Sequence, residues 1–123
     1  MAVTYTTAVK NSRLSAVVTA IGTTGVLEIG TTGMGTVLAT IALGNPAGTT
    51  ASGVLTFSGF PRSDTSADAT GTAAAARIRT ASGGTDIVTG LTVGTSGTDI
   101  ILDSTSITAG QTVTLNSATI THA

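Results

Sequence analysis

The stretch QTVTLNSATIT, residues 111–121, decides the fold class. Val113 and Leu115 fall on one face of an extended chain, and the threonines beside them fall on the other, because successive side chains of a strand point to opposite sides. Such alternation is typical of a β-strand with one buried side. We therefore predict a strand here. Residues 107–113 predict the end of a preceding strand, a tight turn in which Gly110 supplies a positive φ, and the start of this strand.

Six further short runs rich in aliphatic and β-branched residues precede this strand, separated by clusters of Gly, Ser, Asn and Pro. The runs predict strands at residues 25–30, 36–43, 53–58, 72–80, 86–93 and 98–103. No helical period lies between them, which favours a β-sandwich or barrel over alternating strands and helices. We expect a mainly β chain whose residues 23–123 form one antiparallel β-sandwich domain.

One stretch at the start of the chain has a different period. Residues 6–21, TTAVKNSRLSAVVTAI, place apolar side chains at spacings of three and four, which predicts a short N-terminal helix. Thr6 or Thr7 is suited to be its N-cap, and Gly22 is suited to end it. The alternative is an extended arm that becomes helical only when docked, so we treat residues 1–22 as an N-terminal helix or arm.

The composition excludes several classes of function. The chain has no cysteine, so it has neither a disulfide framework nor a thiolate zinc site. A net charge of −1 gives no electrostatic footprint for nucleic acid or an anionic membrane. Charged residues make up only 9% of the chain, and His122 is the one histidine. We therefore expect no enzyme, no cofactor, no nucleic-acid partner and no membrane partner.

The hydrophobic residues predict a folded chain with a thin core. They make up 41% of the sequence, but aromatic residues make up only 2%, so the core is expected to be aliphatic. A small aliphatic core gives a modest stability margin, and a homo-oligomer or larger assembly would supply further burial. No basic leader precedes an apolar segment, and no apolar run approaches the roughly 20 residues of a membrane span, so we expect synthesis in the cytoplasm.

Few residues suggest chemistry, and each has a simpler explanation. His122 lies one residue from the end of the sequence, where side chains are usually solvated. Asp64 and Asp68 lie in an oxygen-rich segment but lack the spacing of a dedicated calcium loop, which favours a solvated turn. Asp99 and Asp103 stand four residues apart along a strand, about 13 Å, too far for a glycosidase pair. We expect this last pair to flank a strand.

The cations are better candidates for contacts with a partner. Arg77 and Arg79 share one face of a predicted strand, and arginine is enriched at protein interfaces. The alternative is an ordinary solvent-facing surface. In the N-terminal helix or arm we expect Lys10, Arg13 and Leu14 to make contacts. These five residues are the predicted interface.

Several segments together carry a resemblance to a known family. They are residues 5–17 (YTTAVKNSRLSAV), 66–73 (SADATGTA), 93–102 (VGTSGTDIIL) and 106–113 (SITAGQTV). With these segments the chain resembles a family of small structural proteins encoded in the head-gene region of tailed bacteriophages. The resemblance extends over nearly the whole chain and contains no catalytic or ligand motif, so it assigns no functional residue.

The resemblance implies a role in the virion. It points to a capsid decoration (cement) protein with a jelly-roll-like fold, placed on the capsid surface, with the major capsid protein or other virion proteins as partners. A collar, fibre or tail-associated phage structural protein is the alternative within this class. A carbohydrate-binding or adhesin-like module is the alternative from another class, although such modules usually stack sugars on exposed aromatic side chains, of which this sequence has few.

Overall fold

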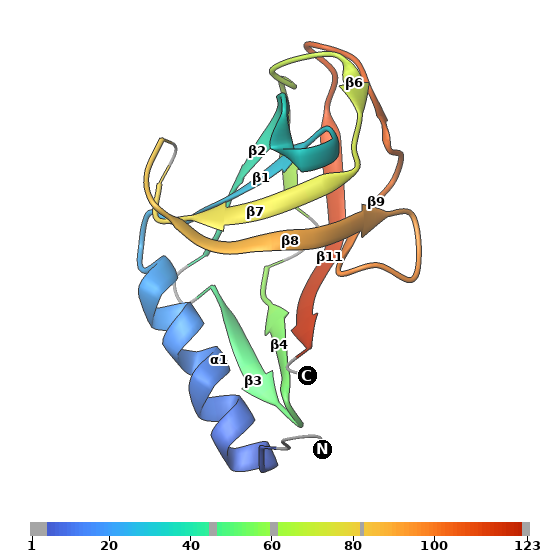
Figure 1. Cartoon of the computed structure of the whole chain (residues 1–123). Coiled ribbons are helices and arrows are strands. Elements are labelled where there is room, and N and C mark those ends of the chain that lie inside the picture. Colours follow the sequence, from blue (N-terminus) through green and yellow to red (C-terminus); the bar gives the residue numbers. More distant parts are fainter. Residues whose placement is uncertain (1–4, 45–46, 60–61, 82, 122–123) are drawn as a thin grey trace.

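The computed structural model describes residues 5–44, 47–59, 62–81 and 83–121. It shows one helix beside a strongly curled β-sheet (Figure 1). In chain order the elements are α1 (Thr7–Ile21), β1 (Val26–Gly30), the 3-10 turn η1 (Thr32–Met34), β2 (Val37–Ala42), β3 (Gly48–Ala51), β4 (Val54–Phe57), β5 (Arg62–Asp64), β6 (Gly71–Thr72), β7 (Ala75–Arg79), β8 (Asp86–Gly94), β9 (Ile100–Leu102), β10 (Ser106–Ile107) and β11 (Val113–Thr121).

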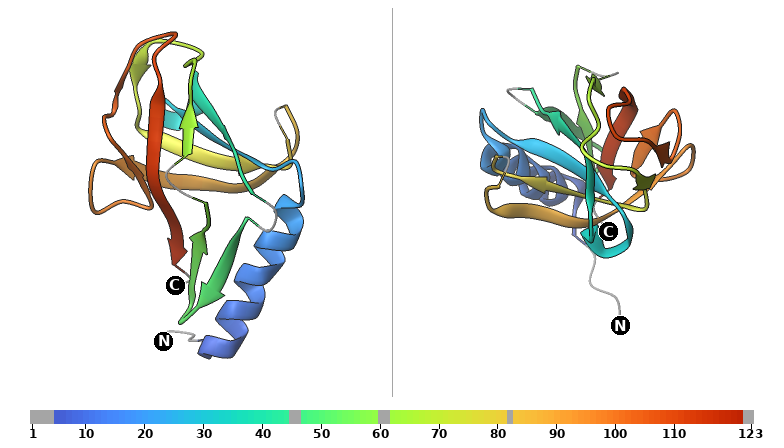
Figure 2. Two further views of the ribbon diagram at one scale, coloured as in Figure 1. Left: turned by 180° about the vertical axis from the view of Figure 1, so that it is seen from behind. Right: turned by 90° about the horizontal axis from the view of Figure 1, so that it is seen from above.

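The strands form one nine-stranded sheet and a separate β6–β10 pair. The order across the large sheet is β2-β1-β7-β8-β9-β11-β4-β3, with β5 beside β11. All these pairs are antiparallel except β8 with β9, which run parallel. The sheet curls as it crosses the molecule (Figures 1 and 2), so the mainly β prediction is confirmed and the arrangement is consistent with a β-sandwich or half-barrel.

Strand β11 pairs with three other strands, and one of them, β5, lies beside the opposite end of the curled sheet. Its first residues pair with β5, its last residues pair with β4, and β9 pairs along its other edge. The β5 segment also reaches β2, the far edge of the sheet. Asp64 Oδ2 accepts a 3.0 Å hydrogen bond from Thr40 N, and Asp68 N donates a 2.7 Å hydrogen bond to Leu38 O. These bonds close the curl without a continuous ladder of backbone pairs.

The interior of the curl is aliphatic, as the sequence predicts. The large side chains with the least exposure are isoleucine and leucine, namely Ile21, Leu27, Ile29, Leu38, Ile41, Leu55, Ile78, Ile100, Leu102, Ile107 and Leu115. Phe57 is the aromatic residue of the described core. Glu28 is the buried charged residue, with 4% of its surface exposed. Its burial requires a partner, because an unpaired carboxylate is costly in an apolar environment.

The structure adds two strands, β3 and β5, in segments expected to be loops. β10 lies at the predicted strand before the turn that leads into β11. The predicted strand at 72–80 is divided into β6 and β7, because the backbone between them bonds elsewhere: Ala73 N donates to Thr105 O and Ala74 N to Gly30 O. The predicted turn glycine, Gly110, has a φ of 82°, as expected.

Candidate interaction surfaces

The inner side of α1 fixes the helix to the sheet. Thr6 is the N-cap, since its side chain accepts from Val9 N, and Gly22 is the C-cap. Asn11 Oδ1 accepts a 2.9 Å hydrogen bond from Gly53 N, in the turn between β3 and β4. Ser15 Oγ lies 3.3 Å from Thr50 Oγ1 on β3. The helix over residues 6–21 is thus confirmed, with bounds Thr7–Ile21.

Leu14 belongs to this inner side, and its predicted place in the interface is wrong. Only 3% of its surface is exposed, and it packs in the same hydrophobic cluster as Ile21 and Leu55. Leu14, Ile21 and the partly buried Val17 and Val18 form the face that packs on the sheet. Leu14 therefore holds α1 in place and has almost no surface to offer to a partner.

The outer side of α1 carries apolar surface that no other described element covers. Tyr5 and Val9 are the exposed large hydrophobic residues of the described chain, at 41% and 43%. Beside them a hollow of about 360 Å³ is lined by Ala8, Val9, Ser12, Arg13 and Ala16. We call Tyr5 and these five lining residues the helix face.

The helix face has one cation, Arg13, and no acid. Arg13 lies over the ring of Tyr5, with its guanidinium carbon 4.6 Å from the ring centroid, a cation–π contact. Lys10 is half-buried and lies on the other side of α1, where its side chain packs beside Gly53 in the turn between β3 and β4. Residues 1–27 contain no Asp or Glu. Within the part of the chain that the structure describes, neither Lys10 nor Arg13 forms an ion pair.

The two strand arginines of the predicted interface pair with acids of their own chain. Arg77 lies opposite Glu28 in the β1–β7 register, and its Nε donates a 2.7 Å hydrogen bond to Glu28 Oε1. Arg79 Nη1 lies 3.7 Å from the same oxygen. Arg79 Nε lies 2.8 Å from Asp86 Oδ1 and forms an ion pair with it. The orientation of the two groups does not make a hydrogen bond. About a fifth of each arginine side chain is exposed, so the cluster is mainly structural and partly accessible.

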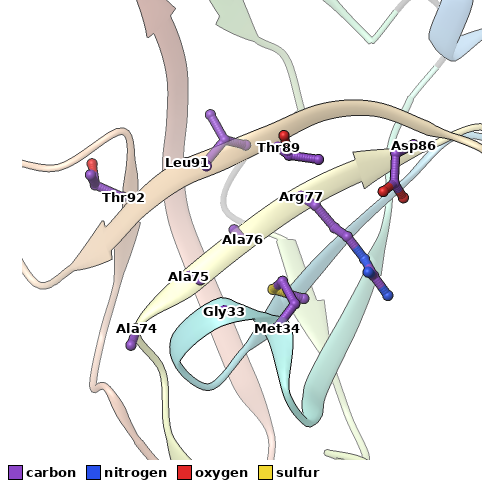
Figure 3. A pocket seen from close by; sticks show the side chains of 11 residues that line it. Gly33, Met34, Ala74, Ala75, Ala76, Arg77, Asp86, Thr89, Leu91 and Thr92 are labelled. Carbon is purple, nitrogen blue, oxygen red and sulfur yellow. The ribbon is translucent and has the colours of Figure 1, made fainter.

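A second hollow lies on the outer side of β7 and β8, next to this cluster (Figure 3). Its volume is about 480 Å³, and alanines of β7 with Met34 and Leu91 form much of its lining. Arg77 and Asp86 lie at one end. The register between β7 and β8 shifts at two places, and Gly90 has a φ of 76°. These irregularities bend β8. The hollow is therefore a surface depression between small side chains, with one ion-paired end.

A third surface lies on the outer side of β3, β4 and β11 and carries no charge. Cross-strand pairing places Thr49, Thr56 and Thr119 in one row. The next row contains Ala51, Val54 and Thr121. All six side chains are exposed or half-buried. We call this set the threonine face; its neutrality means that burying it requires no charge desolvation.

The remaining candidates from the sequence have local structural roles. Asp64 accepts from the backbone of Thr40 and of Ser66. Asp99 accepts from Thr92 N and Oγ1, and Asp103 accepts from Asn116. Asp99 and Asp103 flank β9, as predicted. Among residues 5–44, 47–59, 62–81 and 83–121, no group of three acids or histidines is placed to hold a metal.

His122 lies outside the described residues. Within the same residues as above, no helix is long and apolar enough to cross a membrane.

Comparison with known proteins identifies no relative. No family model, no curated protein and no solved structure matches the chain.

Proposed function

We propose that the chain is a non-enzymatic structural protein of a bacteriophage virion, which binds the outside of the head shell as a decoration, or cement, protein. The observation that carries this proposal is the helix face. A small domain with few catalytic residue types in its sequence presents an apolar, cation-bordered surface on a helix fixed to its sheet. Such a surface suits docking onto another protein. The resemblance of residues 5–17 and of the later segments supports the same role.

The stabilising effect follows from mass action. A protein that binds the assembled shell, and not its separated subunits, shifts the equilibrium toward assembly. Many equivalent sites on one particle add their effects, and a chain that docks as a homo-oligomer gains further through multivalency. The threonine face supports self-association of this kind, because neutral side chains meet without charge desolvation. The partner in this proposal is the major capsid protein, and the location is the capsid surface.

The structure favours this role over the carbohydrate-binding alternative. Sugar-binding modules commonly stack rings on exposed aromatic side chains. Of the two aromatic residues that the structure describes, Phe57 is buried, with 4% of its surface exposed, and Tyr5 lies under the guanidinium of Arg13. A collar, fibre or tail-associated role uses the same kind of docking surface and differs in copy number.

The proposal is tested by adding the purified chain to heads of a phage whose gene for this chain has been deleted. We expect saturable cosedimentation at a molar ratio comparable with the major capsid protein, and release of the genome at a higher temperature than from undecorated heads. Saturation at a handful of copies would favour the collar or fibre role. No binding to heads or to complete particles would contradict a virion role.

A further inference from the structure

We propose that the helix face binds an amphipathic helix of the shell protein, one whose apolar stripe is bordered by Asp or Glu. This inference rests on the proposed function and specifies its contact. The apolar part of the argument comes from exposure: Tyr5 and Val9 are the exposed large hydrophobic residues of the described chain, and both lie on this one face. Together with the hollow beside them, they form a continuous site for an apolar ridge.

The spacing of the lining residues favours a helix as the occupant. Val9 and Arg13 are four residues apart, and so are Ala8, Ser12 and Ala16. Rows at this spacing form ridges and grooves into which the side chains of a second helix fit. Ala8, Ser12 and Ala16 are all exposed and small, so a partner backbone can approach closely there. The β3–β4 hairpin holds α1 through Asn11, and no rearrangement of the helix is required for docking.

The charges specify the chemistry of that partner. Arg13 has no ion-pair partner among the described residues, and the chain supplies no acid before the buried Glu28. The stacking on Tyr5 holds the Arg13 guanidinium at the border of the hollow. A carboxylate on the incoming helix would pair with it there, partly shielded from water, where charge-assisted hydrogen bonds are strong.

The same observations argue against a second copy of this chain as the occupant. Two helix faces packed together about a two-fold axis near Ser12 would bring the Arg13 side chains of the two copies close together, and their like charges would repel. Packing of the helix face onto another part of a second copy would find no exposed large apolar residue within the described chain. The occupant therefore has to bring both the apolar stripe and the acids, which places it on a different protein.

Binding of variants to heads that lack the chain tests the charge. Arg13→Gln removes one positive charge, and Ser96→Glu, in an exposed turn distant in sequence, changes the net charge by the same amount. We expect Arg13→Gln to bind about tenfold more weakly, with a smaller dependence on salt, because one charge-assisted contact is lost. Ser96→Glu is expected to bind like the wild type. Equal binding of both variants and the wild type would overturn the inference and leave the proposed function standing.

Two further variants test the shape and identify the occupant. Ala16→Gln keeps a good helix former and fills the close-approach groove, so we expect about tenfold weaker binding with unchanged thermal unfolding. Because the chain has no cysteine, Ser12→Cys carries a photo-crosslinker at one defined site, with Ser96→Cys as the matched control. The expected product joins Ser12→Cys to a helix of the capsid protein that contains Asp or Glu.

The outcomes separate the two proposals. Crosslinking of Ser12→Cys chiefly to a second copy, or loss of a solution dimer in Ala16→Gln, would overturn the inference. If the wild type does not bind heads or particles at all, the proposed function fails and the inference fails with it.

Discussion

Replacing Arg77 with alanine tests the buried ion pair that joins β1 to β7. Arg77 Nε donates a 2.7 Å hydrogen bond to Glu28 Oε1, and only 6% of the Glu28 side chain is exposed. The substitution removes this bond and leaves a carboxylate in the sheet with Arg79 Nη1, 3.7 Å away, as its remaining ion-pair partner. The variant is therefore expected to lose stability although Arg77 itself is partly exposed.

The magnitude follows from the geometry. A hydrogen bond between charged groups contributes about 1.5–3 kcal/mol, and stranding a buried charge completely costs about 3–5 kcal/mol. Arg79 offsets part of that cost, and so does water, which reaches the site because about a fifth of the Arg77 side chain is exposed in the wild type. We expect the free energy of unfolding to fall by about 2–3 kcal/mol. For a chain of this length that corresponds to a lowering of the Tm by about 8–12 °C.

The assay is reversible denaturant unfolding, followed by circular dichroism, of the wild type, Arg77→Ala, Glu28→Gln and the double variant. We expect a coupling free energy of at least about 1 kcal/mol in this cycle, because the two side chains interact directly. Arg13→Ala is the matched control, since Arg13 is exposed and is expected to contribute less than about 1 kcal/mol. A loss below about 1 kcal/mol for Arg77→Ala, or additive effects of the two substitutions, would refute the reasoning.

Three further substitutions test how α1 is held. Leu14→Ala removes a core side chain and is expected to cost about 2–4 kcal/mol in denaturant unfolding; an unchanged stability would place Leu14 on the surface instead. Asn11→Ala leaves Gly53 N without its side-chain acceptor and is expected to cost about 1 kcal/mol, whereas Ser96→Ala serves as a neutral exposed control. Gly53→Ala forces a Cβ onto a residue with φ of 75°, so a loss of about 1–2 kcal/mol is expected, and a gain in Tm would contradict the turn geometry.

Local sequence patterns were sufficient for the helix and the longer strands. The alternation around Val113 and Leu115 predicted β11, and the spacing of apolar residues in 6–21 predicted α1, because both patterns record which side of an element is buried. β3 and β5 lack a pattern of apolar residues that marks a buried side. β3, with the sequence GTTA, has no large apolar side chain, and its pairing with β4 depends on the turn at Gly53.

The candidate surfaces were predicted only in part. The charges of Lys10 and Arg13 point to contacts with a partner, and both residues lie on α1 outside any ion pair of the described chain. Leu14 carries no charge, and its spacing from Ile21 places it on the inner face. Arg77 pairs with a residue 49 positions away in sequence. That partner depends on strand register, which a single sequence does not reveal. The exposure of Val9 likewise depends on which side of α1 meets the sheet.

The most direct test of the proposed virion role is the number of copies of this chain in purified particles of the proposed phage, measured by quantitative mass spectrometry against the major capsid protein. We predict a molar ratio comparable with that of the capsid protein. Particles that assemble fully and contain none of the chain would contradict the account.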